Sequence, residues 1–375
     1  MCNIPARLLC LSLYVILVNQ LAMTLRLRAP FGGTFLLGVL FIPLFFGLIE
    51  GSFRLALVDE VLAPPTRGGN EDFVGIKVDK LDRLVTETRI NCIFIGSSMI
   101  AYGINPEIIG KSYQQQTGKS LGCYNFGVTG ATTGDLALLA EVVVKRYRPD
   151  VLIVGTSARD FSITAETEGI DVDIPWAHYQ LGEFSLEGWL TDWSVAFRYY
   201  QTYRLWTATD FASRIERLRT INAKLTRFGF FPRAEIRDVS MPPDPAQDGI
   251  GHVTGREVRK YVITNRNRHG FEKIMTMGSD YKPEIIVLEM PLPPSYMAFF
   301  DHPQEDYASY IRMAEKETLM FHAAFIRAPS PDLFPDDSWF DYAHLNKKGA
   351  NIYSDWLGNQ LAELVRLDKL SLQID

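Results

Sequence analysis

The chain is poor in the residues that build compact metal and disulfide sites. It has four cysteines and six histidines in 375 residues, and none of them follows the spacing of a CxxC or HExxH motif. A disulfide framework needs a higher density of cysteine, and a zinc site needs clustered ligands. The sequence therefore predicts neither a disulfide scaffold nor a protein-held metal ion.

Basic charge is also scarce. Lys and Arg total 38 against 44 Asp and Glu, so the formal net charge is −6, and basic residues form only short clusters. Proteins that bind nucleic acid through the phosphate backbone usually concentrate positive charge on one face. We therefore expect no nucleic-acid partner. With 47% hydrophobic residues the chain can bury a large core, and its length favours two domains at most, or one domain with an anchor and an insertion.

One long run near the N-terminus lacks charge altogether. Residues 31–49 read FGGTFLLGVLFIPLFFGLI, which is nineteen residues and long enough to span a bilayer. Pro43 is tolerated in a helix in lipid. We predict a transmembrane helix here, within an anchor region at 1–56. Arg26 and Arg28 precede the run, and the positive-inside rule places them on the cytoplasmic side.

A weaker apolar run covers residues 8–23, and two interpretations of it stay open. It is either a second membrane span, or the true start is Met23, which would leave a short basic segment before a signal anchor. No small-residue cleavage site follows Ile49, which favours a retained anchor. Either interpretation predicts a protein of the cell membrane, with one span or two, whose main domain is extracytoplasmic.

Beyond a Pro- and Gly-rich linker predicted at 57–87, strand-like runs alternate with helical patterns. Short connections between strand, helix and strand require parallel pairing with right-handed crossovers, so the fold class is α/β with a parallel sheet. The predicted strands are 92–95, 121–126, 151–154, 284–290 and 322–326, and the predicted helices are 105–117, 135–147, 257–277, 307–320 and one that starts at Asn346.

Residues 161–254 interrupt this alternation and are predicted to form an insertion that is mainly helical. The part from 176 to 211 is rich in aromatic residues, and 231–252 is a Pro-, Gly- and Asp-rich stretch predicted to be a flexible loop. The aromatic side chains either line a sugar or lipid groove, rest against the membrane surface, or pack a small helical subdomain.

The most distinctive stretch is Gly96-Ser97-Ser98, which follows the buried run 92–95. Gly96 allows a tight turn. A serine on such a strand-to-helix turn lies at the edge of the sheet with backbone N–H groups beside it, which is what a nucleophile needs. The alternative is an ordinary strand end with a serine cap.

Asp341 and His344 lie three residues apart near the start of the last helix. A carboxylate one turn before an imidazole can accept a hydrogen bond from Nδ1–H and leave Nε2 to take a proton from a serine. In an open parallel sheet, ligands bind outside the carboxyl ends of the strands. We therefore expect this pair to meet Ser98 and the turns 127–130 and 157–160 at that edge.

These blocks resemble, in type and order, those of the SGNH/GDSL hydrolase superfamily, over roughly 88–160 and 284–365. The resemblance implies a flavodoxin-like, three-layer α/β/α fold for 88–375. It also implies that Ser98 is the nucleophile, that His344 is the base, and that Asp341 orients His344. Gly130 matches the glycine whose N–H serves the oxyanion hole, and no cofactor is implied.

Two positions depart from the family pattern. Ser97 replaces the usual Asp of the first block, and the third block, residues 155–160, has no Asn. An alignment without gaps puts Arg159 where the Asn belongs, and Ser157 is the other candidate. The predicted oxyanion hole therefore combines the N–H groups of Ser98 and Gly130 with Arg159 or Ser157.

An N-terminal anchor with an outward-facing SGNH domain resembles proteins that move acyl groups on cell-surface polymers, such as those of alginate O-acetylation and of D-alanine transfer to teichoic acid. The resemblance implies an acylated polysaccharide or another cell-envelope ester as substrate, and a membrane-bound O-acyltransferase as partner. Water as acceptor would make the chain an esterase, and a sugar hydroxyl would make it a transferase. A non-catalytic scaffold in a polymer-modification complex is the alternative; the missing Asn favours it, and the intact Ser, Asp and His oppose it.

Overall fold

The computed structural model describes residues 31–55, 63–67, 72–162, 170, 172–204, 210–240, 258 and 260–370. The chain divides into two units, residues 1–61 and 62–375, and each is considered by itself.

In the first unit, helix α2 (Phe31–Phe53) forms where the uncharged run predicts a helix, with Pro43 inside it. Within the described part of the chain, no helix has both the length and the apolar character that crossing a membrane requires. The apolar run 8–23 and Met23 lie outside the described residues. The large hydrophobic side chains of α2 that the structure describes as exposed are Phe41, Ile42, Leu44, Phe45, Phe46 and Leu48.

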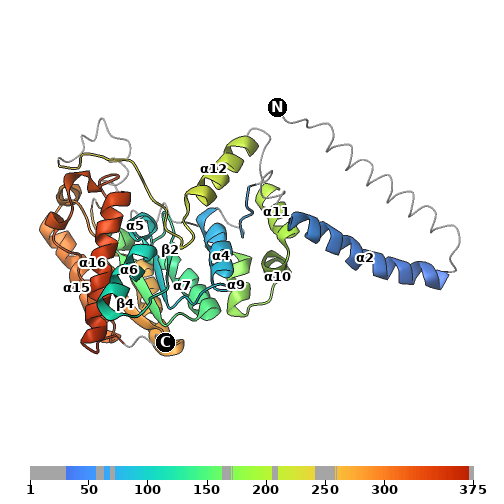
Figure 1. Ribbon diagram of the computed structural model, residues 1–375, viewed down its shortest axis with the longest axis horizontal. Coiled ribbons are helices and arrows are strands. Elements are labelled where there is room, and N and C mark those ends of the chain that lie inside the picture. The colour runs from blue at the N-terminus through green and yellow to red at the C-terminus, as the bar shows by residue number, and fades with distance from the viewer. Residues whose placement is uncertain are drawn as a thin grey trace. The chain divides into compact units, whose positions relative to one another are not determined.

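The second unit is built on a five-stranded sheet in the order β2-β1-β3-β4-β5 (Figure 1). All neighbouring strands are parallel. The predicted strands are confirmed in number, order and approximate position; β1, β2 and β3 are buried along their whole length, as strands covered by helices on both faces are, whereas the edge strand β5 is only partly buried. The strands are β1 (Cys92–Gly96), β2 (Cys123–Gly127), β3 (Val151–Thr156), β4 (Glu284–Glu289) and β5 (Ala324–Ile326).

Helices cover both faces of this sheet (Figure 1). α6 (Pro106–Thr117) packs against α16 (Lys347–Arg366), and α7 (Thr133–Tyr147) packs against α14 (Asn265–Asp280). α15 (Pro303–Met320) contacts β5 and α14. Right-handed crossovers put α6 on one face and α7 on the other, because the chain leaves β1 in one direction and β2 in the opposite one. The predicted parallel α/β sheet with helices is therefore confirmed.

The observed ends of two helices can be compared with the predicted ones. α6 begins after Asn105, whose side chain accepts a hydrogen bond from Glu107 N, and ends at Gly118 with φ of 74°. Both ends agree with the prediction. The prediction of a helix from 257 was wrong in its start, since α14 begins at Asn265 behind a Thr264 cap. An isolated bridge between Ser162 and Ile263 holds the preceding residues extended.

The stretch 57–87 contains a helix where a linker was predicted. α4 spans Asp72–Leu84 and buries Val74, Ile76, Val78 and Leu81 in the cores of the unit. Arg67, before the helix, is also buried and lies 2.6 Å from Asp79 through Nη2 and Oδ1. The proline and glycine pairs that indicate a linker all precede residue 72. They therefore carry no information about the residues that form α4.

Within 161–254 the structure describes four helices, and their aromatic residues are of two kinds. Trp176 and Tyr199 are buried, whereas Phe184, Trp193 and Tyr200 are exposed. Packing of a helical layer therefore accounts for only some of them. The helices are α9 (Pro175–Leu181), α10 (Leu186–Trp193), α11 (Val195–Tyr203) and α12 (Phe211–Lys224).

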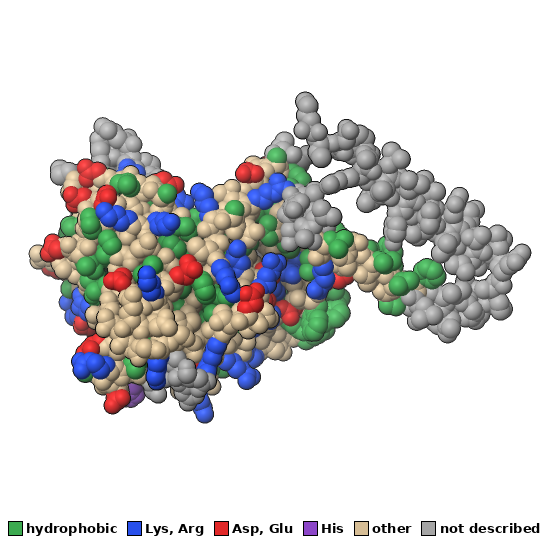
Figure 2. Space-filling model, viewed as in Figure 1, with side chains coloured by type: hydrophobic (Ala, Val, Ile, Leu, Met, Phe, Trp, Pro, Cys, Tyr) green, Lys and Arg blue, Asp and Glu red, His purple; other side chains and the backbone are tan. Residues whose placement is uncertain are grey.

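The surface view shows how charge is distributed. On the face drawn in Figure 2, Lys and Arg side chains are interspersed with Asp and Glu side chains. This face therefore lacks, over the described residues, the extended positive field that binding to a nucleic-acid backbone requires.

Candidate active site

Ser98 is placed by the short helix α5 (Ser98–Gly103), which follows β1 directly. α5 lies against the ends of the strands because those ends are glycines. A Cβ on Gly127 would come within 2.3 Å of Ala101 N, and one on Gly155 within 2.1 Å of Ile100 Cδ1. Larger residues at these positions would push the helix away from the sheet. Ser98 therefore lies at the carboxyl edge of the sheet, as predicted.

The far end of α5 is held by a buried polar network. Asn125 donates through Nδ2 to the carbonyl oxygens of Ile100 and Ile104, both at 2.7 Å. Lys77, from α4, is fully buried and donates to Asn125 O at 2.9 Å and to Asn125 Oδ1 at 3.3 Å. The amide of Asn125 thus gives both carbonyl oxygens a donor from outside the helix, in addition to Ile104 N, which donates to Ile100 O at 3.2 Å. The network fixes the helix that carries Ser98.

Ser98, His344 and Asp341 are brought together as the sequence predicts. Ser98 Oγ lies 2.7 Å from His344 Nε2. On the other side of the imidazole, Nδ1 lies 2.8 Å from Asp341 Oδ1 and 2.9 Å from Oδ2. With its proton on Nδ1, the ring donates to the carboxylate and presents Nε2 as the acceptor for the serine O–H.

The carboxylate of Asp341 is held in place and kept ionised. The backbone N–H groups of Ala343 and His344 each donate to Oδ1 at 2.8 Å. Burial by itself acts to raise the pKa of Asp341, but the charge of His344 and these hydrogen bonds outweigh burial and lower the pKa below its ordinary value. A charged, fixed carboxylate is what stabilises an imidazolium during proton transfer.

Gly130 lies in a turn after β2. Ala131 N donates to Val128 O at 3.3 Å, and Gly130 has φ of 83°. This is the pattern of a type II turn with glycine at its third position. The N–H of Gly130 takes no part in that turn hydrogen bond. Gly130 therefore remains a candidate donor to an oxyanion.

The structure distinguishes the two candidates for the third donor. The hydroxyl of Ser157 lies 3.0 Å from Asp160 Oδ2, in a capping box at the start of η1 (Ala158–Phe161). Arg159 instead reaches the turn that holds Gly130, where Nη1 donates to Ala131 O at 3.2 Å. Of the two side chains, that of Arg159 contacts the residue after Gly130, and its Nη1 also lies 3.5 Å from Asp160 Oδ1.

Residues 230–237 contact the elements that carry the site, and sequence reasoning missed these contacts. Phe231 N donates to Ala101 O in α5 at 3.0 Å, and Arg233 O accepts from Lys347 N at 2.7 Å. The prediction of a loop is confirmed over 231–240, which forms neither helix nor strand, and backbone hydrogen bonds hold it at Phe231, Arg233 and Arg237. Residues 241–252 lie outside the described part. Pro232 lies between Phe231, which is bonded to α5, and Arg233, which is bonded to the start of α16.

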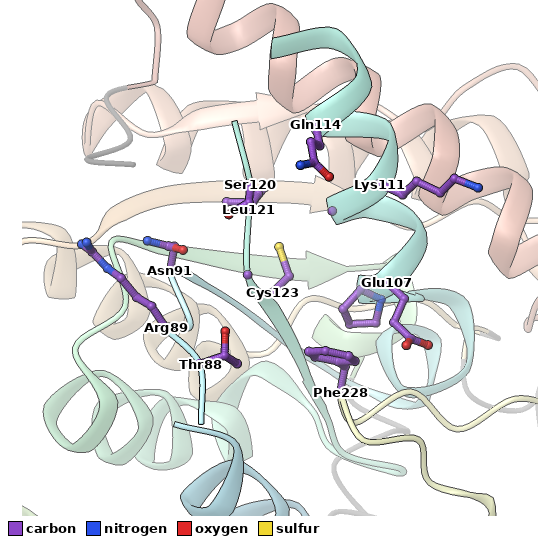
Figure 3. A pocket seen from close by; sticks show the side chains of 13 residues that line it. Thr88, Arg89, Asn91, Glu107, Lys111, Gln114, Ser120, Leu121, Cys123 and Phe228 are labelled. Carbon is purple, nitrogen blue, oxygen red and sulfur yellow. The ribbon is translucent and has the colours of Figure 1, made fainter. Parts of the chain in front are cut away.

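A separate groove of about 550 Å³ lies at the other edge of the sheet (Figure 3). It is lined by Asn91 and Cys123, at the amino ends of β1 and β2, and by Glu107 and Lys111 of α6. Ser98 follows the carboxyl end of β1, so this groove is distinct from the candidate site. Among the described residues, no group of three or more His, Cys, Asp or Glu side chains is arranged to hold a metal ion.

Solved structures similar to this chain include a lipase/acylhydrolase from Enterococcus faecalis, at 12% identity and a TM-score of 0.37, covering 76% of this chain and 100% of that one. A GDSL-like lipase from Bacteroides thetaiotaomicron has 10% identity and a TM-score of 0.36, covering 78% and 99%. An inhibitor-bound aryl esterase from M. smegmatis has 12% identity and a TM-score of 0.32, covering 73% and 99%. No protein-family model and no curated protein matches the chain. The case for a function therefore rests on the geometry of the site.

Proposed function

We propose that the chain is a serine esterase of SGNH type that works through a covalent acyl-enzyme. The observation that carries the proposal is the pair of contacts at His344, with Ser98 Oγ at 2.7 Å from one ring nitrogen and Asp341 Oδ1 at 2.8 Å from the other. Distances of 2.6–3.2 Å are what transfer of a proton from nucleophile to base requires.

In the first half of the reaction, Ser98 Oγ forms a bond to the acyl carbon while its proton passes to His344 Nε2. The carbonyl oxygen becomes an oxyanion. Collapse of this tetrahedral species breaks the bond to the alcohol oxygen, which leaves with the proton from His344. In the second half, water loses a proton to His344 and attacks the acyl-enzyme, and Ser98 recovers its proton when the acid leaves.

The oxyanion is stabilised by three donors in this proposal. Ser98 N–H lies in the first turn of α5 and has no acceptor within the helix. Gly130 N–H and the guanidinium of Arg159 complete the set. A charged donor forms a stronger hydrogen bond than the neutral Asn amide of the family pattern, so Arg159 can compensate for the missing Asn.

The substrate and acceptor are proposed from the sequence resemblance. It supports an acyl ester, above all an O-acetyl ester, of an extracytoplasmic polysaccharide, and a membrane-bound O-acyltransferase as partner. Release of acetate from acetylated glycans, measured with and without an acceptor sugar, separates an esterase from an O-acyltransferase. An esterase releases free acetate in both cases, whereas a transferase passes the acetyl group to the sugar.

Attachment to the cell membrane is likewise a proposal from the uncharged run 31–49, and it is tested by fractionation. The full chain should stay with the membrane pellet after alkaline carbonate extraction, and a chain that starts at residue 57 should not. Recovery of both chains in the supernatant would contradict the proposal.

A serine-directed fluorophosphonate tests the proposed catalysis directly. The full-length chain should be labelled, and the variant Ser98→Ala should not. The absence of any labelling of the natural sequence would favour the second candidate, a non-catalytic scaffold, which the missing Asn of the third block supports.

A further inference from the structure

Arg233 lies on two aromatic rings that themselves contact the imidazole of His344. Its guanidinium carbon is 4.0 Å from the centre of the Phe340 ring and 5.4 Å from that of Tyr102. The ring centres of Tyr102 and Phe340 lie 5.2 Å and 6.4 Å from that of His344. A single layer of rings therefore separates the guanidinium from the base of the triad.

The backbone fixes this position from both sides. Tyr102 lies four residues after Ser98 in α5, so the two side chains share a face of the helix. Arg233 O accepts from Lys347 N, and Phe231 N donates to Ala101 O. The segment that carries Arg233 is thus joined to the helix of the nucleophile and to the start of α16, which follows His344. The placement of Arg233 is a property of the fold.

The charge of Arg233 is weakly compensated. The nearest carboxylate among the described residues is that of Glu235, whose Oε2 lies 3.7 Å from Nε, which is too long for a hydrogen bond. Nε is buried and has no hydrogen-bond partner among the described residues. Leaving a buried donor of a charged group unsatisfied is energetically unfavourable.

The neighbouring charges do not remove this imbalance. The guanidinium carbon of Arg237, on the same segment, lies 4.9 Å from the centre of the Tyr342 ring. Lys348 is paired with Asp337 at 2.6 Å, so that carboxylate is already engaged. Arg233 is therefore the basic side chain that stacks on the rings next to His344, and a bound anion would neutralise its charge.

We propose that Arg233 recognises a carboxylate carried by the substrate, so that the site selects esters with an anionic group a few bonds from the scissile carbonyl. This inference rests on the proposed esterase function and adds a substrate class to it. The buried Nε cannot reach a ligand, so the two Nη groups at the end of the guanidinium would bind the carboxylate, which arginine can do through two parallel hydrogen bonds. The carboxylate belongs either to the acyl group or to the alcohol.

Matched esters test the proposal and distinguish these two sources. The acyl-side pair is 4-nitrophenyl butyrate and the 4-nitrophenyl half ester of succinate. The alcohol-side pair is an O-acetylated uronic acid and its methyl ester. The full-length natural chain should prefer the charged member of one pair in kcat/KM. In Arg233→Gln that preference should fall about 10- to 100-fold, the equivalent of one charged hydrogen bond.

In Arg233→Gln the loss in kcat/KM should be at least about 10-fold larger for the charged member than for the neutral one. Arg233→Lys should keep part of the preference, because lysine retains the positive charge but lacks the planar pair of N–H groups that binds a carboxylate. Arg237→Gln is the matched control on the same segment and should keep all of it. An unchanged preference in Arg233→Gln, or equal losses for both members, would overturn the proposal.

Failure of the proposed function gives a different result. A natural chain that hydrolyses no ester and takes no fluorophosphonate contradicts catalysis by Ser98, whatever Arg233 does. Arg233 is then tested by calorimetric titration of the Ser98→Ala variant with the succinate half ester. Binding that disappears in Ser98→Ala/Arg233→Gln supports the carboxylate site, and equal binding by both variants overturns it.

Discussion

Ser98 Oγ and His344 Nε2 lie 2.7 Å apart although 246 residues separate them in the chain. Replacement of the nucleophile should therefore remove catalysis while leaving the fold intact. We expect Ser98→Ala to lower kcat by about 10⁴-fold or more, as loss of a serine nucleophile does elsewhere. Ser97→Ala is the neighbouring control and should keep both labelling and turnover, because the Ser97 side chain is fully buried. Retained labelling of Ser98→Ala would mean that another residue is the nucleophile.

Asp341 should matter through the orientation and charge of His344. Asp341→Asn keeps the size of the side chain but removes the acceptor that fixes the imidazole tautomer. A drop in kcat of about 10³- to 10⁴-fold is expected, with a smaller change in KM. The control is Asp336→Asn, whose side chain is exposed in the same loop and away from the triad. Steady-state kinetics on a neutral ester check both variants, and equal activities would contradict the role of Asp341.

The same carboxylate gives a prediction for stability against pH. Because the folded state lowers the pKa of Asp341, its ionised form stabilises the fold above the unfolded pKa, which is about 3.9. That contribution is lost as the pH falls through the lower, folded-state pKa. The free energy of unfolding of the natural chain should therefore decrease more steeply below about pH 4 than that of Asp341→Asn. Urea unfolding at several pH values measures this, and parallel curves would contradict it.

Arg159 and Ser157 should differ in their effect on the rate. Arg159→Met removes the guanidinium next to the Gly130 turn and should lower kcat by about 10²- to 10³-fold if it supplies an oxyanion donor. Arg159→Lys should recover part of this loss. Ser157→Ala removes a hydroxyl that is bonded to Asp160. This variant should therefore have a lower free energy of unfolding, while its kcat, calculated per molecule that takes the fluorophosphonate label, should stay unchanged. The reverse pattern would assign the donor to Ser157.

The network below α5 should be a large contributor to stability. Asn125→Ala would leave the carbonyls of Ile100 and Ile104 and the buried Lys77 Nζ with fewer partners. We expect a loss of about 2–5 kcal/mol in the free energy of unfolding. Asn359→Ala breaks a comparable amide bond to Asp355 O at the surface and should cost less than about 0.5 kcal/mol. Similar losses in the two variants would show that burial is not what matters.

The sequence was most informative where a local signal decides the structure. The apolar runs became β1 to β5, and Asn105, Pro106 and Gly118 mark the ends of α6 as the capping rules require. The triad was predictable because the loops after parallel strands meet at one edge of the sheet. The start of α14 was not, since Thr264 caps it only while the bridge from Ser162 holds Ile263 extended.

Contacts between segments that are distant in the chain could likewise not be predicted, because no local signal marks them. Pro232 and Arg233 look like loop residues, because nothing near them in the chain announces Ala101, Phe340 or Lys347 as partners. Lys77 shows no sign in the sequence that it would be buried, since its acceptors belong to Asn125 on β2. Binding and positioning residues of this kind follow from the packed fold and not from a motif.

The segment 230–237 also determines how this protein can be engineered. Residues 161–254 resemble an accessory block that an engineer would delete or exchange to change specificity. Yet Phe231 and Arg233 are bonded to the helix of the nucleophile and to the start of the last helix. A chimera that replaces the whole block would remove these hydrogen bonds beside the triad, so its exchange boundary should fall before residue 230.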